Sequence, residues 1–268
     1  MKTVRMMARP FVFLLLTAVF IIPVLLLFLQ SVSSPWRFGT LLPGDLNTGG
    51  WLHISGDPGL QHAIMVTVGL GAAVVALNLL IAVPAARFLA FREFRGKSVL
   101  DTILFMPILV PVIAIAMGLH LVFIRIGIAD SFTGVLIVHL IPTVPYAIRI
   151  FRAGFERIGT KWEEQCRTLG SGRWQTFWHA ELPRLAPSLR AAVFLTMVIS
   201  LSQYVLTVII GGGRVVTLPL LYYPYAAGGN DTITAAFSIL FAAVPVTMVL
   251  VIEILLRTVL PYPLKRST

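Results

Sequence analysis

The chain has 268 residues, of which 57% are hydrophobic and only 12% are charged, and its formal net charge is +10. Soluble domains carry roughly 25% charged residues, so this composition excludes an ordinary soluble globular protein. Cys166 is the single cysteine, which excludes an intrachain disulfide and a thiolate metal cage.

Long uncharged stretches recur along the whole chain, each near the roughly 20 apolar residues that a membrane-crossing helix needs. They predict six transmembrane helices, over residues 10–34, 60–86, 102–124, 131–150, 189–211 and 232–256. The predicted fold class is therefore an all-α integral membrane protein. The polar segments are too short to form a separate core, so we expect residues 1–268 to form a single transmembrane domain.

Positive charges are distributed unevenly between the predicted loops. If the first span starts in the cytoplasm, only Arg37, Arg125 and Arg214 of the 21 Lys and Arg residues fall on the outer side. Such a bias predicts that both termini are cytoplasmic. The basic total is then a signal of membrane topology, and we expect no nucleic-acid partner.

Prolines and glycines predict irregular segments between and within the spans. Pro107 and Pro111 loosen the third span, either as a simple kink or as a bend that lines a transport path. The outer loop 37–57 is rich in Gly, Pro, Asn and Asp, which predicts little regular structure. Residues 215–230 are uncharged but too short to cross, so we expect a short helix and a loop there.

The longest basic loop, residues 151–186, contains the most distinctive pattern. Apolar residues recur there in steps of three or four, as on one face of a helix, at Phe151, Phe155, Ile158, Trp162, Cys166 and Leu169. Gly170 is suited to end this helix, Ser171 to cap a second helix over residues 173–180, and Pro183 to stop it. Periodicity alone leaves two interpretations open: a helix lying on lipid, or a docking element for another protein.

The spacing of four residues in this loop is similar to a known motif. Glu164, Gly170 and the Leu182–Pro183 pair are spaced as in the EAA loop of binding-protein-dependent ABC importer permeases, and the six-span layout resembles that family too. Gln165 and Cys166 replace the two alanines of the motif. The resemblance implies the type I importer permease fold, with a cytoplasmic coupling helix between the fourth and fifth spans.

The same resemblance implies a role for the motif residues and a set of partners. The residues implied to couple to the ATPase are Glu164, Gln165, Cys166, Gly170, Leu182 and Pro183. The implied partners are two ATP-binding subunits, a second permease subunit that is either a paralogue or a copy of this chain, a periplasmic substrate-binding protein and membrane lipid. The implied location is the bacterial inner (plasma) membrane. The chain has no Walker lysine loop, so ATP would be bound by the partner subunits, and we expect no cofactor and no enzymatic activity.

The likeness also suggests a substrate class. The chain is similar to the importer branch that handles polyamines, iron(III), sulfate, thiamine or phosphonates. Within it, residues 211–219 look most like polyamine, iron and thiamine permeases. We therefore expect a small polar solute of this kind, delivered by the binding protein.

A polar cluster in the fifth span is the candidate lining of the transport path. On a continuous helix, Ser200, Gln203 and Tyr204 would lie near one face. Polar groups in a membrane often face a cavity, although an interhelical hydrogen bond is the alternative for each of them. Near the inner end of the sixth span, Glu253 is expected to pair with Arg257.

Two other functions compete with the importer interpretation. An ion-coupled secondary transporter would fit the spans, but we find no convincing internal repeat. An intramembrane enzyme would need a catalytic motif. The chain has neither a His-Glu-x-x-His pair nor a Gly-x-Ser-x-Gly elbow, and His120 and His139 lie on different predicted spans.

Overall fold

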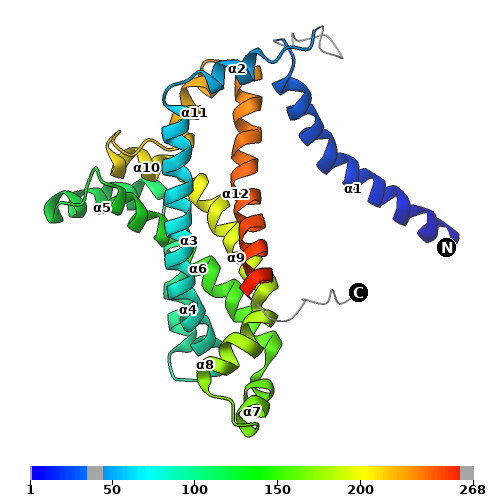
Figure 1. Ribbon diagram of the computed structural model, residues 1–268, viewed down its shortest axis with the longest axis vertical. Coiled ribbons are helices and arrows are strands. Elements are labelled where there is room, and N and C mark those ends of the chain that lie inside the picture. Colours follow the sequence, from blue (N-terminus) through cyan, green and yellow to red (C-terminus); the bar gives the residue numbers. More distant parts are fainter. Residues whose placement is uncertain (1, 35–44, 260–268) are drawn as a thin grey trace. The chain divides into compact units, whose positions relative to one another are not determined.

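The structure is a computed structural model that describes residues 2–34 and 45–259, with side chains from Leu15 onward in the first range and to Thr258 in the second. These ranges are mainly helical, which confirms the predicted all-α class (Figure 1). Residues 35–44 of the predicted outer loop and the basic residues Lys265 and Arg266 lie outside the described residues.

Four helical segments are long and apolar enough to cross a membrane: α3 (Leu60–Phe91), α6 (Phe132–Ile158), the segment Arg173–Leu201, and α12 (Asp231–Val259). A bent helix pair raises this number to five. The described part of α1 (Lys2–Ser31) adds a shorter apolar helix, Leu15–Ser31. In the described residues, helix length and composition therefore give four or five spans, so the predicted number of six is not confirmed.

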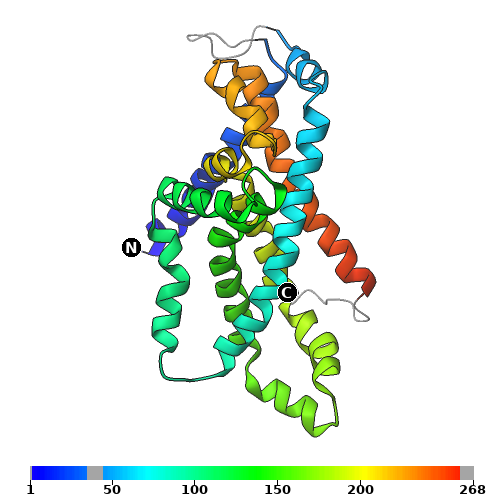
Figure 2. The same cartoon turned by 90° about the vertical axis from the view of Figure 1, so that its left-hand side faces the viewer.

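The third predicted span is broken into two helices. α4 (Lys97–Leu109) and α5 (Val112–Ile126) meet at an angle of 96°, and Figure 2 shows this turn. Pro111 occupies the position before α5 and disfavours helical geometry at Val110, which is extended with ψ 134°. Pro111 therefore marks a full break, which is stronger than the kink considered above, whereas Pro107 lies inside α4.

The fifth predicted span also differs from a continuous helix over residues 189–211. α9 (Leu182–Leu201) ends where the chain breaks at Ser202 and Gln203, and α10 (Tyr204–Gly211) follows. At its other end, α9 continues directly from α8 (Arg173–Thr176) through the π-helix η1 (Phe177–Glu181). The apolar helical segment therefore lies further toward the N-terminus than predicted.

Pro183 does not stop the helix, contrary to the prediction. In η1 the Leu182 N–H donates to the Phe177 carbonyl, five residues back, which is the wider spacing of a π turn. Pro183 then lies in the first turn of α9, where its missing N–H costs least. The helix continues through this position because the π turn changes the hydrogen-bond register just before the proline.

Contacts group the chain into two compact units, and the first consists of Met1–Gln61 and Leu221–Ala242. It contains α2 (Gly49–Ser55), so the outer loop has more regular structure than predicted. It also contains most of α11 (Leu218–Ala227), which matches the short helix expected between residues 215 and 230. Within the unit, Thr232 donates to the Ser33 carbonyl at 3.0 Å and Tyr225 to Asp57 at 2.9 Å.

The second unit consists of His62–Leu220 and Ala243–Thr268. Its apolar core joins α3, α5, α6 and α10 and contains Leu70, Val74, Ala116, Phe123, Val135, Val138, Leu206, Ile210 and Val215. α6 also packs along α9, where Gly154 lies directly against Ser188. This unit carries all the predicted site residues.

Candidate functional site

The 151–186 loop begins as a continuation of α6 and then turns at a glycine. α6 ends at Ile158, and Gly159 has φ 74° and ψ 163°, a conformation that is essentially restricted to glycine. The separate helix α7 (Thr160–Thr168) follows. The prediction of a single helix across residues 151–169 is therefore wrong. The apolar residues keep their helical spacing across the break, and Gly159 is the only residue in the sequence that indicates it.

The end of α7 agrees with the prediction for Gly170. This residue has φ 83°, its N–H donates to the Arg167 carbonyl, and the Ser171 N–H donates to the Cys166 carbonyl. These two bonds form a Schellman motif, in which glycine takes the left-handed position at low cost. The chain then reverses into α8, and Figure 1 shows α7 and α8 beyond the ends of α6 and α9.

Two sides of α7 have different environments. Trp162, Glu163 and Cys166 are half-buried, whereas Glu164 and Gln165 are exposed. Leu169, at the end of the helix, is 87% exposed. The structure thus separates the predicted coupling residues: Glu164 and Gln165 are accessible from outside the chain, and Cys166 lies on the side toward the rest of the unit.

Helix α8 adds exposed aromatic surface beside this turn. Its N-cap residue is Gly172 and not Ser171, and the Gly172 N–H donates to Gln175 Oε1 at 3.3 Å. Ser171 instead accepts a hydrogen bond from the Thr176 hydroxyl at 3.1 Å. Trp174 is 76% exposed. Large exposed apolar side chains clustered on one surface are a common sign of a protein interface.

An ion-pair cluster that the sequence analysis missed lies where this loop meets α3. Arg87 forms two hydrogen bonds to Glu181, Nε to Oε2 at 3.1 Å and Nη2 to Oε1 at 2.9 Å, and also lies 3.1 Å from Glu163. Glu181 is only 2% exposed. Removing Arg87 would leave a buried unpaired carboxylate, which costs roughly 3–5 kcal/mol. The only signal in the sequence was the Glu181 carboxylate between two apolar residues, and nothing near it pointed to Arg87 as its partner.

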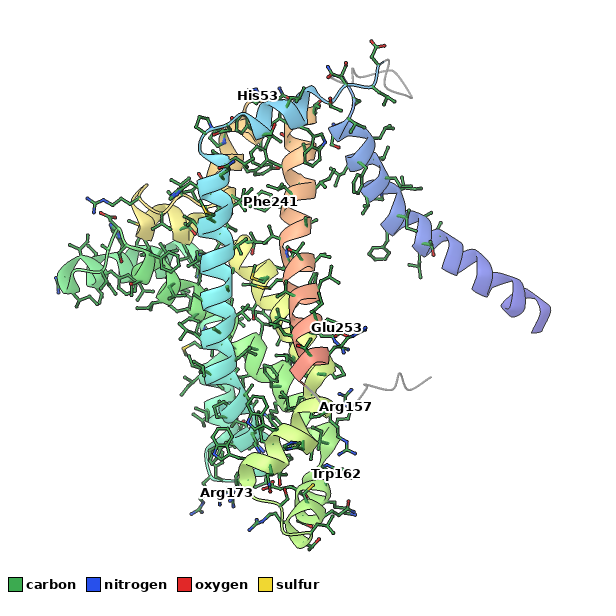
Figure 3. The ribbon with its side chains drawn as sticks, in the orientation of Figure 1. His53, Arg157, Trp162, Arg173, Phe241 and Glu253 are labelled. Carbon is green, nitrogen blue, oxygen red and sulfur yellow. The ribbon has the colours of Figure 1, made fainter. Side chains whose placement is uncertain are left out.

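A second link joins α7 to the start of α9. The guanidinium of Arg184 lies over the Trp162 ring, 3.4 Å from its centre, and Figure 3 shows Trp162 on α7. A cation over an indole ring is attracted by the negative face of the ring. Helix α7 is therefore attached to α3 by an ion pair of Glu163 and to α9 by a cation–π contact of the adjacent Trp162.

The centre of the second unit contains a buried polar group built around His139. Nδ1 of this residue lies 2.9 Å from the Ser200 hydroxyl and Nε2 lies 2.9 Å from the Thr207 hydroxyl. Thr207 donates its own proton to the Gln203 carbonyl at 2.6 Å, so Nε2 is the protonated nitrogen and Nδ1 accepts from Ser200. One imidazole thus bonds to α9 and to α10 on both sides of their break.

This Ser–His pair does not form a nucleophilic site. The second imidazole nitrogen contacts a threonine hydroxyl and not a carboxylate that would orient a base. The adjacent cavity, lined by residues such as Thr67, Ser200 and Thr217, has a volume of about 10 Å³, which is room for about one water. Among the described residues, no group of three His, Cys, Asp or Glu side chains could hold a metal ion.

The predicted path residues face different surroundings. A larger cavity of about 350 Å³ is lined by apolar residues of α4, α5, α6 and α9 together with Tyr146 and Gln203. Ser200, by contrast, is buried against His139, and Tyr204 begins α10. The helix break therefore separates residues that a continuous helix would have placed on one face.

The C-terminal end of α12 behaves as the sequence predicted, with one addition. Arg257 Nε lies 2.8 Å from Glu253 Oε1, which confirms the expected pair. Arg190 of α9 also donates to Glu253 Oε2, at 2.6 Å. Glu253, labelled in Figure 3, therefore joins two helices and does not pair only within its own.

Comparisons with known proteins agree with this geometry. A family model described as "Binding-protein-dependent transport system inner membrane component" matches residues 78–261. The sulfate transport system permease protein CysW of Synechococcus elongatus is 30% identical over 186 residues, covering 64% of this chain and 65% of that protein. The molybdenum transport system permease protein ModB of Escherichia coli K12 is 25% identical over 221 residues, covering 75% and 95%. The chain thus spans slightly less than two thirds of the CysW protein.

The fold has a close counterpart among solved structures. A chain of a bacterial ABC transporter involved in the import of the acidic polysaccharide alginate superposes with a TM-score of 0.69 at 18% identity, covering 94% of this chain and 96% of that one. At this identity the match shows the fold alone. It supports the predicted type I importer permease architecture around the broken spans described above.

The family match covers most of the chain and includes the loop, α9 and α12. This protein belongs to the binding-protein-dependent transport system inner membrane components, the ABC permease family that the EAA-type spacing indicated. It is therefore a multi-pass inner-membrane protein of a transport system, and members of this family are not themselves enzymes.

Proposed function

We propose that this chain is the permease subunit of an ATP-driven importer, and that the exposed surface of its 151–186 loop docks on an ATP-binding subunit. The observation that carries this proposal is the position of α7. It projects beyond α6 and α9 and exposes Glu164 and Gln165, and the turn after it exposes Leu169. The exposed apolar residues Leu169 and Trp174 argue for a protein partner, since a partner would remove them from water.

The proposed partners are two ATP-binding subunits, a second permease that is a paralogue or a copy of this chain, and a periplasmic binding protein. ATP would close the ATP-binding subunits and move the docked loops, so that the helices switch between inward-open and outward-open states. The ATP itself stays on the partners. In this arrangement both termini and the loop lie in the cytoplasm, as the distribution of Lys and Arg predicts.

The proposed substrate is a small inorganic oxyanion such as sulfate or molybdate. The relatives named for sulfate and molybdenum transport support this class, whereas nothing in these comparisons supports the expected polyamine, iron or thiamine. Among the described residues that line the larger cavity, none is charged, and Gln203 and Tyr146 supply hydrogen-bond donors. Conduction requires that the solute binds weakly enough to leave again. Neutral hydrogen-bond donors along the path would solvate an anion without binding it as tightly as a cationic side chain would.

Gln203 is our best-supported path residue, because it lines the larger cavity. Tyr204 stays in the proposal as its neighbour at the start of α10. Ser200 belongs to the His139 group and its proposed role is structural.

The docking proposal is tested with the purified transporter, assembled in liposomes from this chain, its second permease subunit, its ATP-binding subunits and its binding protein. We expect Glu164→Ala and Gly170→Asp to lower ATP-driven uptake at least about tenfold while the permease remains in the membrane. The Asp side chain would strain a backbone at φ 83°, and a non-glycine residue there costs roughly 1–2 kcal/mol. Unchanged uptake and ATP hydrolysis in both variants would refute the docking role.

The substrate class is tested by uptake of radiolabelled sulfate and molybdate into the same liposomes. We expect one of these anions to accumulate only with ATP and the binding protein present. A polyamine and thiamine serve as controls and should not accumulate. Uptake of a cationic solute in place of either anion would contradict the oxyanion proposal.

A further inference from the structure

Helix α7 is joined to its neighbours in the chain by a glycine at each end. Gly159 precedes it with φ 74°, and Gly170 follows it with φ 83°. Open space surrounds both positions, since a Cβ built on either glycine would meet no atom within 4 Å. Glycine permits a wide range of backbone angles, so no side chain at these two joints hinders a change in the direction of α7.

Side chains must therefore fix the position of α7, and two adjacent residues provide the contacts. The Glu163 carboxylate lies 3.1 Å from Arg87 Nη2 on α3, and the Trp162 ring lies under the Arg184 guanidinium of α9. Glu164, the next residue, is exposed on another side of the helix. One side of α7 is thus attached to two long helices while another remains free.

Arg87 is itself held firmly in place. Its guanidinium makes two hydrogen bonds to the buried Glu181 in the π-helix that leads into α9. Paired hydrogen bonds between a guanidinium and a carboxylate fix both groups in one geometry. Arg87 therefore presents a fixed charge to Glu163. The Glu163 side chain is 26% exposed, so its contact can be removed without unpairing a buried group.

We propose that Trp162 and Glu163 are positioning residues that form a clamp and transmit the movement of α7 to α3 and α9. This inference rests on the proposed docking of the loop on an ATP-binding subunit. When the partner moves α7, Glu163 pulls on α3 through Arg87, and Trp162 pulls on the start of α9 through Arg184. Without the clamp, α7 would rotate about Gly159 and Gly170, and its movement would not reach α3 and α9.

The test uses Glu163→Gln, which removes the charge and keeps the size of the side chain. Glu93→Gln is a matched control outside the 151–186 loop: it also neutralises one carboxylate of an ion pair, the pair with Lys97, whose Nζ keeps its bond to the Arg92 carbonyl. Each variant is assembled with the ATP-binding subunits and studied by ATP hydrolysis with and without the purified binding protein. A spin label on Cys166, one turn from Trp162, reports the mobility of α7.

We expect Glu163→Gln to lower the stimulation of ATP hydrolysis by the binding protein about two- to fivefold, the effect of one partly exposed ion pair. The label on Cys166 should become more mobile, and the complex should still assemble. Glu93→Gln should change neither quantity. Trp162→Leu should lower the stimulation and raise the label mobility as Glu163→Gln does. Trp162→Phe should retain most of the stimulation, because the face of a phenyl ring still attracts a cation.

Stimulation or label mobility that stays at the wild-type level in Glu163→Gln would overturn the clamp. Its failure is distinguishable from failure of the docking proposal, which Glu164→Ala tests on the exposed side of α7. If Glu164→Ala uncouples the transporter and Glu163→Gln does not, only the clamp is wrong. If Glu164→Ala has no effect, the docking proposal itself fails.

Discussion

Single residues decide the geometry of this chain where helices approach closely or end. Gly170 was predicted from the sequence because a glycine directly after an amphipathic helix is the usual C-terminal signal. Gly159 was not predicted, since it lies inside an uninterrupted apolar periodicity. Arg87 and Glu181 were missed for another reason: they are 94 residues apart, and no local pattern joins them.

The contact between Gly154 and Ser188 leads to a prediction at this scale. A Cβ at residue 154 would overlap the Ser188 hydroxyl, so α6 and α9 approach this closely only because residue 154 has no side chain. We expect Gly154→Val to lower the free energy of unfolding by roughly 1–3 kcal/mol through overpacking. Thermal unfolding of the purified protein in detergent measures the loss.

The matched control for this change is Gly118→Val in α5. A Cβ there would meet no atom within 4 Å, whereas the change in intrinsic helix propensity from Gly to Val is the same as at residue 154. An equal loss of stability in both variants would mean that helix propensity, and not close packing of α6 on α9, explains the effect.

At the scale of elements, hydrophobic length predicted where helices lie but not where they break. The break between α4 and α5 follows from Pro111, which was recognised, although its 96° angle was not. The break between α9 and α10 has no proline or glycine in it. It occurs at Ser202 and Gln203, where His139 on a different helix supplies hydrogen bonds to both sides.

Thr207 offers a test of this bridge. Thr207→Val keeps the shape of the side chain and removes its hydrogen bonds to His139 and to the Gln203 carbonyl. An unsatisfied buried group costs about 1–2 kcal/mol, so we expect roughly five- to thirtyfold faster hydrogen exchange at the amides of residues 204–211.

Thr247→Val in α12 provides the comparison for this prediction. The Thr247 hydroxyl bonds only locally, to the Val244 carbonyl at 2.8 Å. Exchange in α10 should be unchanged in this control. Unaltered exchange in Thr207→Val would show that the imidazole does not stabilise the break.

At the scale of the whole molecule, the distribution of Lys and Arg predicts which side of the membrane each loop occupies. Cys166, the single cysteine, lies on α7 and is half-buried, so it is a native probe of the side of the membrane on which the 151–186 loop lies. We expect a membrane-impermeant maleimide to label it in inverted membrane vesicles and not in intact spheroplasts.

Leu46→Cys, combined with replacement of Cys166 by serine, gives the reciprocal control. Leu46 is 74% exposed and lies in the predicted outer loop. It should be labelled in spheroplasts and protected in inverted vesicles. Labelling of Cys166 from outside would reverse the topology and remove the basis for docking on a cytoplasmic partner.

The sequence by itself determined the helical membrane class, the family and the position of the 151–186 loop. These conclusions rest on patterns of neighbouring residues, namely the length of the apolar stretches, the uneven distribution of charge and the spacing of Glu164, Gly170 and Pro183. Only the tertiary structure decided that α9 continues through Pro183, that two spans are broken, and that Arg87 joins Glu163 to Glu181. The break between α9 and α10 and the ion pairs of Arg87 depend on hydrogen bonds and charges supplied by residues far away in sequence, and a local pattern contains no information about such partners.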